Sequence, residues 1–322
     1  MQYDVISIGS ATVDVFIKTA ISDIIDPSEK RGDELLCYPL GEKILINHLE
    51  FQTGGGGTNT SVAFARLGLK TAYLGQLGED DNADRVLAVL KREKVTFLGS
   101  KKGKTGYSVI LDSKAKDRTI LTYKGANDAF RFKPPKEKTT WAYCASMTGN
   151  SFKELVKAAT YFKKKGAKIA FNPSMYIAKM GKTILSKLLK QCDVLILNRE
   201  EAMALLGQEM DIPRAVCALR ALGPGIVGIT DGNRGAWAAD ANNAFHVNPL
   251  PVNVCETTGA GDAFASSFVA GLFYGLSLQD CMRLGMTNAE SVITHYGAKN
   301  NLLTKKLAFA QLKRDAHSFS KV

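Results

Sequence analysis

ETTGAGDAFASSFVAGLFYG, residues 256–275, contains a turn of small residues followed directly by an apolar run that predicts a buried helix over 263–275. The small residues 259–261 leave backbone N–H groups uncovered, and the helix start adds the positive end of its dipole, so this turn suits an anion. Asp262 is unusual here because a carboxylate repels phosphate. It could orient and deprotonate a hydroxyl beside a transferred phosphoryl group, or it could only cap the helix, and the spacing alone fits both.

The rest of the chain alternates short apolar runs with segments of helical period. The runs predict strands at 3–8, 70–77, 141–146, 168–171, 193–197 and 225–230. Amphipathic stretches between several of them predict helices at 80–93, 151–165 and 181–190. Because this alternation is typical of βαβ units, we expect an α/β fold with a mostly parallel sheet. No Pro/Ser-rich linker interrupts the pattern, so we treat 1–322 as a single domain.

Two regions depart from this alternation. In the first, the runs 107–112 and 118–123 flank a polar turn, which is typical of an antiparallel hairpin with one buried face. In the second, 14–52, two strand-like segments flank a polar loop. We expect the regions 14–52 and 105–125, with approximate limits, to form a small sheet beside the main one.

A run of four glycines precedes Asn59 in the segment Gly54-Gly55-Gly56-Gly57-Thr58-Asn59. Glycines let a ligand approach the backbone closely, and the Asn59 amide offers a donor and an acceptor to hydroxyl groups. A flexible loop would have the same composition, so this motif alone leaves both interpretations open.

Two further motifs follow apolar strands. Asn198-Arg199-Glu200-Glu201 comes directly after one strand, and Thr230-Asp231-Gly232-Asn233-Arg234-Gly235 after the next. The carboxyl ends of such strands are where α/β sheets bind ligands, and a Glu there could hold the water shell of Mg²⁺. The first motif could equally be an acidic helix start and the second a tight hairpin. No complete Walker A motif is present, and no Gly-x-Gly-x-x-Gly follows the first strand.

Composition limits the class of protein. With 45% hydrophobic and 23% charged residues, the chain is not intrinsically disordered as a whole. Its apolar windows are too short to span a membrane, and 3–8 predicts a strand rather than a leader segment. Six scattered cysteines fit reduced thiols, so we expect a cytoplasmic protein without a membrane partner. The net charge of +11 attracts anions, but the short lysine runs indicate solvated faces, so we expect no nucleic-acid partner.

In this order, the motifs resemble those of the ribokinase or PfkB family of sugar and nucleoside kinases. The resemblance rests on residues 55–61, the pair Asn198 and Glu201, the set Thr230, Gly232 and Gly235, and residues 257–262. It runs from about residue 3 to about residue 300. The resemblance implies a ribokinase-like three-layer α/β/α core with a mostly parallel sheet, plus a small β lid formed by the two irregular regions.

The resemblance also assigns roles on the nucleotide side. Asp262 would be the catalytic base, and backbone N–H groups of Gly259, Ala260 and Gly261 would form an anion hole for charge on the γ-phosphate of ATP. Asn198 and Glu201 would position Mg²⁺ and the phosphates through water. The residues along ATP would be Thr230, Gly232 and Gly235, with Asn288 near the base.

On the acceptor side, the resemblance implies that Asp14, Gly55, Gly56 and Asn59 hold the hydroxyl groups of the substrate. Lid closure would exclude water, and pairing of lids would form a homodimer. Two departures matter. Gly56 stands where ribokinases carry Lys, which leaves ribose open as the substrate. Glu256 stands where the signature often has an Asp that binds a monovalent cation, which leaves a role for K⁺ open.

The sequence therefore predicts an ATP- and Mg²⁺-dependent kinase that phosphorylates a hydroxyl of a small sugar. A nucleoside acceptor would need an apolar wall, for which the candidates are Phe16, Tyr107 and Tyr123. A sugar-phosphate acceptor would need an added cation, for which the candidates are Lys43, Arg118 and Lys124. From a different class, a non-catalytic basic nucleic-acid-binding protein would be recognised by salt-dependent retention on DNA or RNA.

Overall fold

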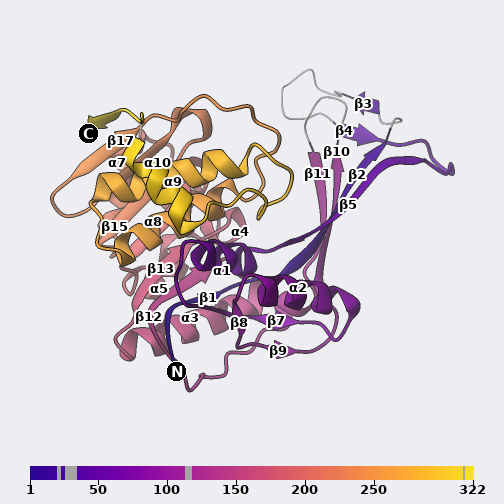
Figure 1. Ribbon diagram of the computed structural model, residues 1–322, viewed down its shortest axis with the longest axis horizontal. Helices are drawn as coiled ribbons and strands as arrows, with labels where there is room; N and C mark the ends of the chain where they lie inside the picture. Colours follow the sequence, from indigo (N-terminus) through magenta and orange to yellow (C-terminus); the bar gives the residue numbers. More distant parts are fainter. Residues whose placement is uncertain (20–22, 26–34, 113–117, 315) are drawn as a thin grey trace.

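The computed structural model describes residues 1–19, 23–25, 35–112, 118–314 and 316–322. Its main sheet has ten strands in the order β18-β17-β16-β15-β14-β13-β12-β1-β6-β8 (Figure 1). These are β1 (Gln2–Ile8), β6 (Thr71–Leu74), β8 (Thr96–Phe97), β12 (Lys138–Ala145), β13 (Lys168–Asn172), β14 (Val194–Asn198), β15 (Ile226–Thr230), β16 (Ala236–Ala239), β17 (Ala244–Val247) and β18 (Phe319–Lys321). All pairs from β8 to β15 are parallel, and β16, β17 and β18 join antiparallel. The predicted α/β class and mostly parallel sheet are confirmed.

Side chains alternate between the two faces of the central strands, and both faces are buried. On β14, Leu195 and Leu197 belong to one apolar cluster, while Val194 and Ile196 belong to the cluster on the opposite face. Strands with helices on both sides show such near-continuous apolar runs, because every second residue faces a different layer. This is why the predicted strands were visible as uninterrupted apolar segments.

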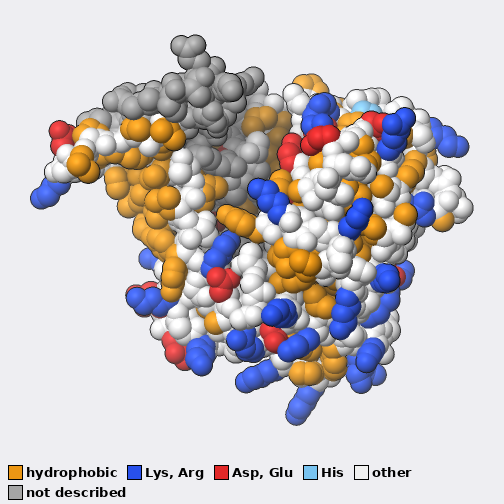
Figure 2. Space-filling model, turned by 180° about the vertical axis from the view of Figure 1, so that it is seen from behind, with side chains coloured by type: hydrophobic (Ala, Val, Ile, Leu, Met, Phe, Trp, Pro, Cys, Tyr) orange, Lys and Arg blue, Asp and Glu red, His pale blue; other side chains and the backbone are white. Residues whose placement is uncertain are grey.

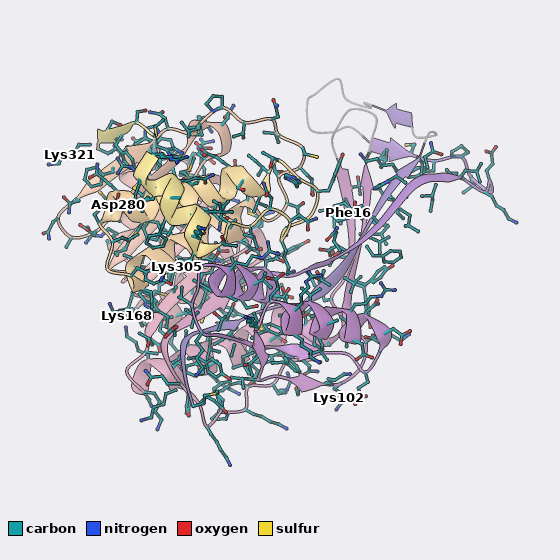
Figure 3. All side chains as sticks on the ribbon, viewed as in Figure 1. Phe16, Lys102, Lys168, Asp280, Lys305 and Lys321 are labelled. Atoms are coloured by element: carbon teal, nitrogen blue, oxygen red, sulfur yellow. The ribbon has the colours of Figure 1, made fainter. Side chains whose placement is uncertain are left out.

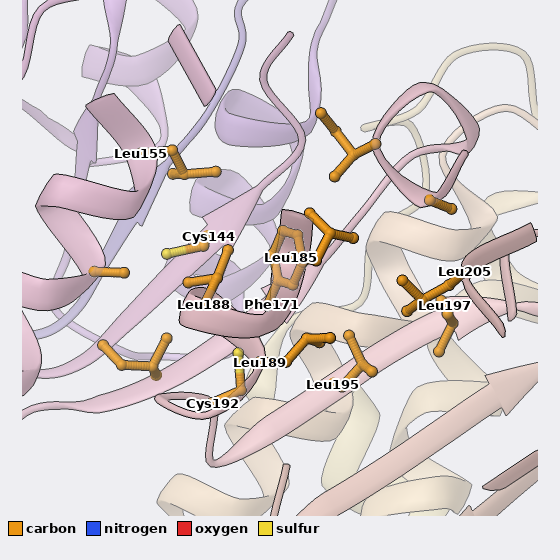
Figure 4. Close-up of a cluster of buried hydrophobic side chains, with 14 of the residues drawn as sticks. Cys144, Leu155, Phe171, Leu185, Leu188, Leu189, Cys192, Leu195, Leu197 and Leu205 are labelled. Carbon is orange, nitrogen blue, oxygen red and sulfur yellow. The ribbon is translucent and has the colours of Figure 1, made fainter. Parts of the chain in front are cut away.

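Helices cover each face of the main sheet. One face carries α1 (Gly56–Arg66), α8 (Ala260–Phe273), α9 (Leu278–Val292) and α10 (Lys305–Arg314). The other carries α3 (Gly149–Lys164), α4 (Met175–Ala178), α5 (Gly181–Leu189), α6 (Arg199–Leu206) and α7 (Ile212–Arg220). Figure 4 shows the second layer, where Leu185 of α5 lies beside Phe171 of β13, and Leu155 of α3 lies nearer Cys144 of β12. The helix α2 (Asp81–Arg92) packs beside α1 in a third cluster.

A second sheet extends from the core, with the order β11-β10-β2-β5 (Figure 1). Its strands are β2 (Thr12–Thr19), β5 (Ile46–Gly54), β10 (Gly106–Asp112) and β11 (Arg118–Tyr123). We call this sheet the lid. Two short pairs accompany the sheets, β3 (Asp23–Ile25) with β4 (Leu35–Cys37), and β7 (Gln76–Leu77) with β9 (Ser100–Lys101). The predicted hairpin and small sheet are confirmed, while 20–22, 26–34 and 113–117 of the predicted lid regions lie outside the described residues.

The strand register gives the lid one apolar face and one more polar face, on which Phe16, Ile110 and Ile120 alternate with Asp14 and Ser108. Leu121 pairs with Val109, Val109 with Val15, and Val15 with Phe51, so these four share one face. The neighbouring positions carry Asp14, Ser108 and Gln52 on the opposite face. The buried side chains in β10 are Ser108 and Ile110, whereas Val109 is only half-buried. The prediction of one buried face was therefore right about the alternation but did not identify the face of Ser108 and Ile110 as the one turned inward.

No helix among the described residues is long and apolar enough to cross a membrane. The six cysteines all lie in the described part of the chain and are free thiols.

Arg66, the last residue of α1, ties three segments of the molecule together. Its Nε and Nη2 atoms donate to the Glu93 carboxylate at 2.9 and 2.8 Å, and Nη1 donates to the backbone oxygens of Lys299 and Leu302, both at 3.2 Å. The hydrogen bond from Arg66 is the main reason that the pKa of Glu93 is lowered. One guanidinium group thus connects α1, the end of α2 and the loop that follows α9.

We predict that Arg66→Met lowers the free energy of unfolding by about 2 kcal/mol at neutral pH, because it removes charge-assisted hydrogen bonds from a partly buried carboxylate. The pKa of Glu93 in the folded protein lies below its ordinary value of 4.5, so this stabilisation is present above pH 4.5 and is lost as the pH falls through the lowered pKa. Urea unfolding at several pH values measures both effects.

Arg92→Met is the matched control, because the Arg92 side chain is 71% exposed and lies 3.6 Å from the same carboxylate. We expect it to change the free energy of unfolding by less than about 0.5 kcal/mol. Equal losses in the two variants would contradict the role given to Arg66.

Candidate active site

A cleft of about 380 Å³ opens at the carboxyl ends of the parallel strands. Its lining includes Asn172, Asn198 and Thr230, which are the last residues of β13, β14 and β15. Gly259, Gly261 and Asp262 at the start of α8 form the opposite wall. The cleft therefore lies where open α/β sheets bind their ligands.

The start of α8 has the geometry of an anion site. Gly259 adopts a left-handed conformation with φ of 84°, and no side chain caps the first N–H groups of the helix. A Cβ atom on Gly259 would lie 2.5 Å from the Cα of Ala298, so only glycine fits there. The Ala260 N–H donates to the Thr257 oxygen at 3.2 Å, so the N–H groups of Gly261 and Asp262 are the ones in the first turn that suit a ligand. Gly261 lies beside Asp262 on the cleft wall.

Asp262 faces the cleft from the first turn of α8. Its Oδ2 atom accepts a hydrogen bond of 2.8 Å from Nδ2 of Asn59, which belongs to α1. A Cβ atom on Gly56 would lie 3.6 Å from Oδ1, so this second oxygen points toward the start of α1. Burial raises the pKa of Asp262, while the Asn59 hydrogen bond and the charge of Lys299 lower it. The carboxylate is bound to another helix, so it does not serve as a cap of α8.

The glycine run allows α1 to approach the end of β1. A Cβ atom on Gly57 would lie 2.7 Å from the backbone carbon of Gly9. Gly55, with φ of 92°, would place a Cβ atom 2.6 Å from the backbone oxygen of Ser10. Gly56 lines the cleft. The run is therefore a close-packing device that brings Asn59 to Asp262, as well as a candidate wall for a ligand.

Lys299 is part of the site, although the sequence did not indicate it. The side chain is buried, and Nζ donates to Oδ1 of Asn59 and to the backbone oxygen of Thr53, both at 2.6 Å. A single lysine in a polar loop carries no local signal of such a role. Burial is the largest cause that lowers its pKa, to about 7.

Asp14 lies on the polar face of the lid, outside the residues that line the main cleft. Its carboxylate packs against Gly54, where a Cβ atom would lie 1.8 Å from Oδ2. Hydrogen bonds from Ser108 and Thr12 and the charge of Lys299 lower its pKa, but burial is the largest cause and raises it. The structure therefore places Asp14, a buried acid, close to Lys299.

Asn198 and Glu201 both line the cleft, and they also form a capping box at the start of α6. Asn198 Oδ1 accepts from the Glu201 N–H at 2.8 Å, and Glu201 Oε2 accepts from the Asn198 N–H at 3.0 Å. Burial raises the pKa of Glu201 to about 7. Asn198 and Glu201 therefore form a helix start and also line the cleft, while their role as a ligand site stays a prediction.

Three of the residues predicted for the nucleotide side lie away from the cleft lining. Gly232 and Gly235 belong to the tight connection between β15 and β16, where a Cβ atom on Gly235 would lie 2.0 Å from the Val247 oxygen. The resemblance places Asn288 near a nucleotide base, and this stays a prediction. Asn288 is fully buried, donates to Ser267 Oγ at 2.7 Å and accepts from the Leu303 N–H at 2.9 Å. These bonds hold α8, α9 and the following loop together.

Glu256 is buried at the back of the anion turn, and its Oε2 atom accepts from the Gly297 N–H at 3.0 Å. Among the described residues, no group of three or more His, Cys, Asp or Glu side chains could hold a metal ion. The cleft therefore has a single acid from α6 and another from α8, a donor set suited to an ion that keeps most of its water.

The fold and the cleft define a ribokinase-like α/β/α protein with an anion turn opposite the strand ends. The chain belongs to the pfkB family of carbohydrate kinases, whose sequence profile matches residues 11–305. It is similar to an uncharacterized sugar kinase of Archaeoglobus fulgidus, with 28% identity over 75% of this chain and 98% of that protein.

Solved structures show the same fold. An Arabidopsis thaliana ribokinase complexed with ribose and ATP is 22% identical, with a TM-score of 0.80 over 97% of this chain and 99% of that chain. A nucleoside kinase of Methanocaldococcus jannaschii is 20% identical, with a TM-score of 0.78 over 97% of this chain and 98% of that chain. The predicted family and the predicted three-layer core are confirmed.

We predict that Gly259→Ala lowers the free energy of unfolding by about 2 kcal/mol or more, because the added methyl group meets Ala298 and the backbone conformation disfavours an L residue. Gly261→Ala is the matched control. A Cβ atom there meets nothing within 4 Å, so we expect no loss of stability. Urea unfolding of both variants provides the comparison, and an equally stable Gly259→Ala would show that the turn is not constrained as described.

Proposed function

We propose that the protein is a single-domain, ATP- and Mg²⁺-dependent kinase that transfers the γ-phosphate to a hydroxyl group of a small sugar. The observation that carries this proposal is the position of Asp262, a carboxylate in the first turn of a helix whose uncapped N–H groups suit a phosphate. A base and an anion hole at the same helix start are what in-line phosphoryl transfer needs.

In the proposed reaction, the acceptor hydroxyl gives its proton to Oδ1 of Asp262, while its oxygen forms a bond to the γ-phosphorus. The bond from that phosphorus to the bridging oxygen breaks, and ADP leaves with the electron pair. The N–H groups of Gly259, Ala260 and Gly261 stabilise the charge on the transferred group. Asn59 holds Oδ2 of Asp262, so Oδ1 is the oxygen assigned to the proton.

On the nucleotide side, Asn198 and Thr230 line the cleft next to Glu201. The Arabidopsis ribokinase of the same fold is described in complex with ribose and ATP, which supports ATP as the donor. Glu201, through water, is the residue that would hold Mg²⁺, and the ion would neutralise phosphate charge. We do not assign Asn288, Gly232 or Gly235 a direct contact with the nucleotide.

For the acceptor, a free sugar fits the hydrogen-bonding groups of the inward face of the lid. Asp14 and the second N–H of the Asn59 amide offer an acceptor and a donor to hydroxyl groups. A sugar phosphate is the second candidate, because Lys124 lines the cleft, 5.3 Å from the centre of the Tyr176 ring. The side chain of Arg118 lies outside the described residues. A K⁺ site at Glu256 stays a prediction, tested by assays with and without K⁺.

We predict that Asp262→Asn lowers kcat by about 10³-fold while ATP binding is retained, because the amide cannot accept the hydroxyl proton. In the wild type, kcat should fall as the pH drops through the pKa of Asp262, which burial raises above its ordinary value of 3.8. Steady-state kinetics from pH 5 to 9 and ATP titration calorimetry measure these effects.

Asp280→Asn is the control for this change, since it removes the same charge from a residue of α9 far from the cleft (Figure 3). It should keep wild-type kcat. A folded Asp262→Asn protein with near-normal turnover would show that the base has been assigned wrongly.

We further propose that the lid forms the interface of a homodimer in the cytoplasm. The outer part of its apolar face is uncovered, with Leu49 and Leu121 exposed to 51% and 57%, whereas Val13 and Val15 nearer the core are buried. Figure 2 shows apolar side chains gathered along this part of the molecule. Such a patch is typical of a protein contact, and an isologous interface needs the same patch on both copies.

We predict that Leu121→Glu converts the dimer to a monomer, because it places a charge on this apolar face. Light scattering coupled to size-exclusion chromatography measures the mass. Ile184→Glu is the control, since Ile184 is exposed to a similar extent, 59%, but belongs to α5 on the core. A monomeric wild type would rule out the proposed interface.

A further inference from the structure

A buried lysine lies behind the candidate base. Lys299 is 7% exposed, and its Nζ atom donates to two oxygens, one on Thr53 at the end of β5 and one on the amide of Asn59. Asn59 in turn donates to Oδ2 of Asp262 at 2.8 Å. These contacts form a continuous chain from the lid strand to the carboxylate in the cleft.

The chemistry of this chain fixes the orientation of the Asn59 amide. A lysine ammonium group only donates hydrogen bonds, and an ionised carboxylate only accepts them. An amide between the two must therefore turn its oxygen to Lys299 and its nitrogen to Asp262. Without the Lys299 donor, the amide oxygen loses its partner, so the Asn59 side chain is held only through its nitrogen and the carboxylate has a less fixed partner.

We propose that Lys299 is a positioning residue for phosphoryl transfer, which holds the Asn59 amide so that Asp262 presents Oδ1 to the acceptor hydroxyl and which ties this geometry to the lid strand β5. This inference rests on the proposed function. Lys299 acts through Asn59, so its loss should affect the reacting geometry rather than ATP binding.

The segment 296–300, which carries Lys299, contacts both the lid and the anion turn. Tyr296 accepts a hydrogen bond of 2.6 Å from Lys18 of β2, and Gly297 donates to Glu256. Ala298 fills the space beside Gly259, and the backbone oxygen of Lys299 accepts from Arg66. The segment is therefore held at several points, so the backbone from which the Lys299 side chain extends has a fixed position.

Four charged groups face Lys299 from the elements packed around it. Asp14 of β2, Asp262 of α8 and Glu93 after α2 favour its charged form, whereas Arg66 of α1 opposes it. Lys299 also lines a second cavity, of about 340 Å³, together with Arg85 and Arg92. In return, the charge of Lys299 lowers the pKa of both Asp262 and Asp14. Removing this charge should raise the pKa of Asp262.

The test compares Lys299→Met, which removes both the donor and the charge, with Lys299→Gln, which keeps an N–H donor but removes the charge. We expect Lys299→Met to lower kcat by about 10- to 100-fold with little change in KM for MgATP. The kcat of Lys299→Gln should be about tenfold higher than that of Lys299→Met. In both variants the acidic limb of the kcat profile should move up by about one pH unit. Wild-type kcat and an unmoved limb in folded Lys299→Met would overturn the proposal.

Lys168→Met is the matched control. Lys168 begins β13 at the end opposite the cleft and lies over Trp141, well away from the lid (Figure 3). It should leave kcat and the pH profile unchanged. An equal shift in this variant would show that net charge, rather than the contact with Asn59, causes the effect.

A measurement that needs no acceptor separates this inference from the proposed function. Carbon-13 NMR of aspartate carboxyl groups, with the Asp262 signal assigned by Asp262→Asn, reports the titration of Asp262 directly. We expect its midpoint to move up in both Lys299 variants and to stay in Lys168→Met. If it moves while the wild type phosphorylates nothing, the kinase proposal fails, and with it the role in phosphoryl transfer, but the coupling of Lys299 to Asp262 stands. If it does not move, the positioning role fails whatever the activity.

Discussion

The Asp262 carboxylate must remain charged at the start of α8, where the backbone N–H groups also suit a phosphate. Asp262 meets this constraint through two partners on other elements, the Asn59 amide on α1 and the Lys299 ammonium group beyond it. Burial disfavours the charged form of Asp262, and both partners partly offset this effect on its pKa. The rest of the site can be understood as the support that keeps these partners in place.

That support depends on close contacts between backbones. Gly57 lets α1 pack against Gly9 at the end of β1, and Gly259 leaves room for Ala298. Both contacts bring a helix start to the carboxyl ends of the parallel strands, where Asn198 and Glu201 close the other side of the cleft. The lid adds a polar inner face, so that its strands supply Asp14 as well as an outer apolar surface.

The core and the motifs could be predicted from the sequence because their signals are local. The strands of the main sheet are buried on both faces and appear as apolar runs, and the turn 259–261 lies directly before its helix. Lys299 could not be predicted in this way. Its contact with Asn59 joins residues 240 positions apart, and the Asn59 contact with Asp262 spans 203. The hydrogen bonds of Asn288 could not be predicted for the same reason, because only the packed structure shows that its amide is used within the core.

The most direct test of the account is an ADP-release assay with MgATP and a panel of ribose, fructose, 2-keto-3-deoxygluconate, adenosine, cytidine, inositol and fructose 6-phosphate, with and without K⁺. Mass spectrometry of each acceptor would identify the product. The account predicts ADP release that depends on one free sugar, with one phosphate added to that sugar for each ADP formed. ADP release that is independent of any acceptor, or bound ATP with no transfer to any member of the panel, would contradict the proposed phosphorylation of a small sugar.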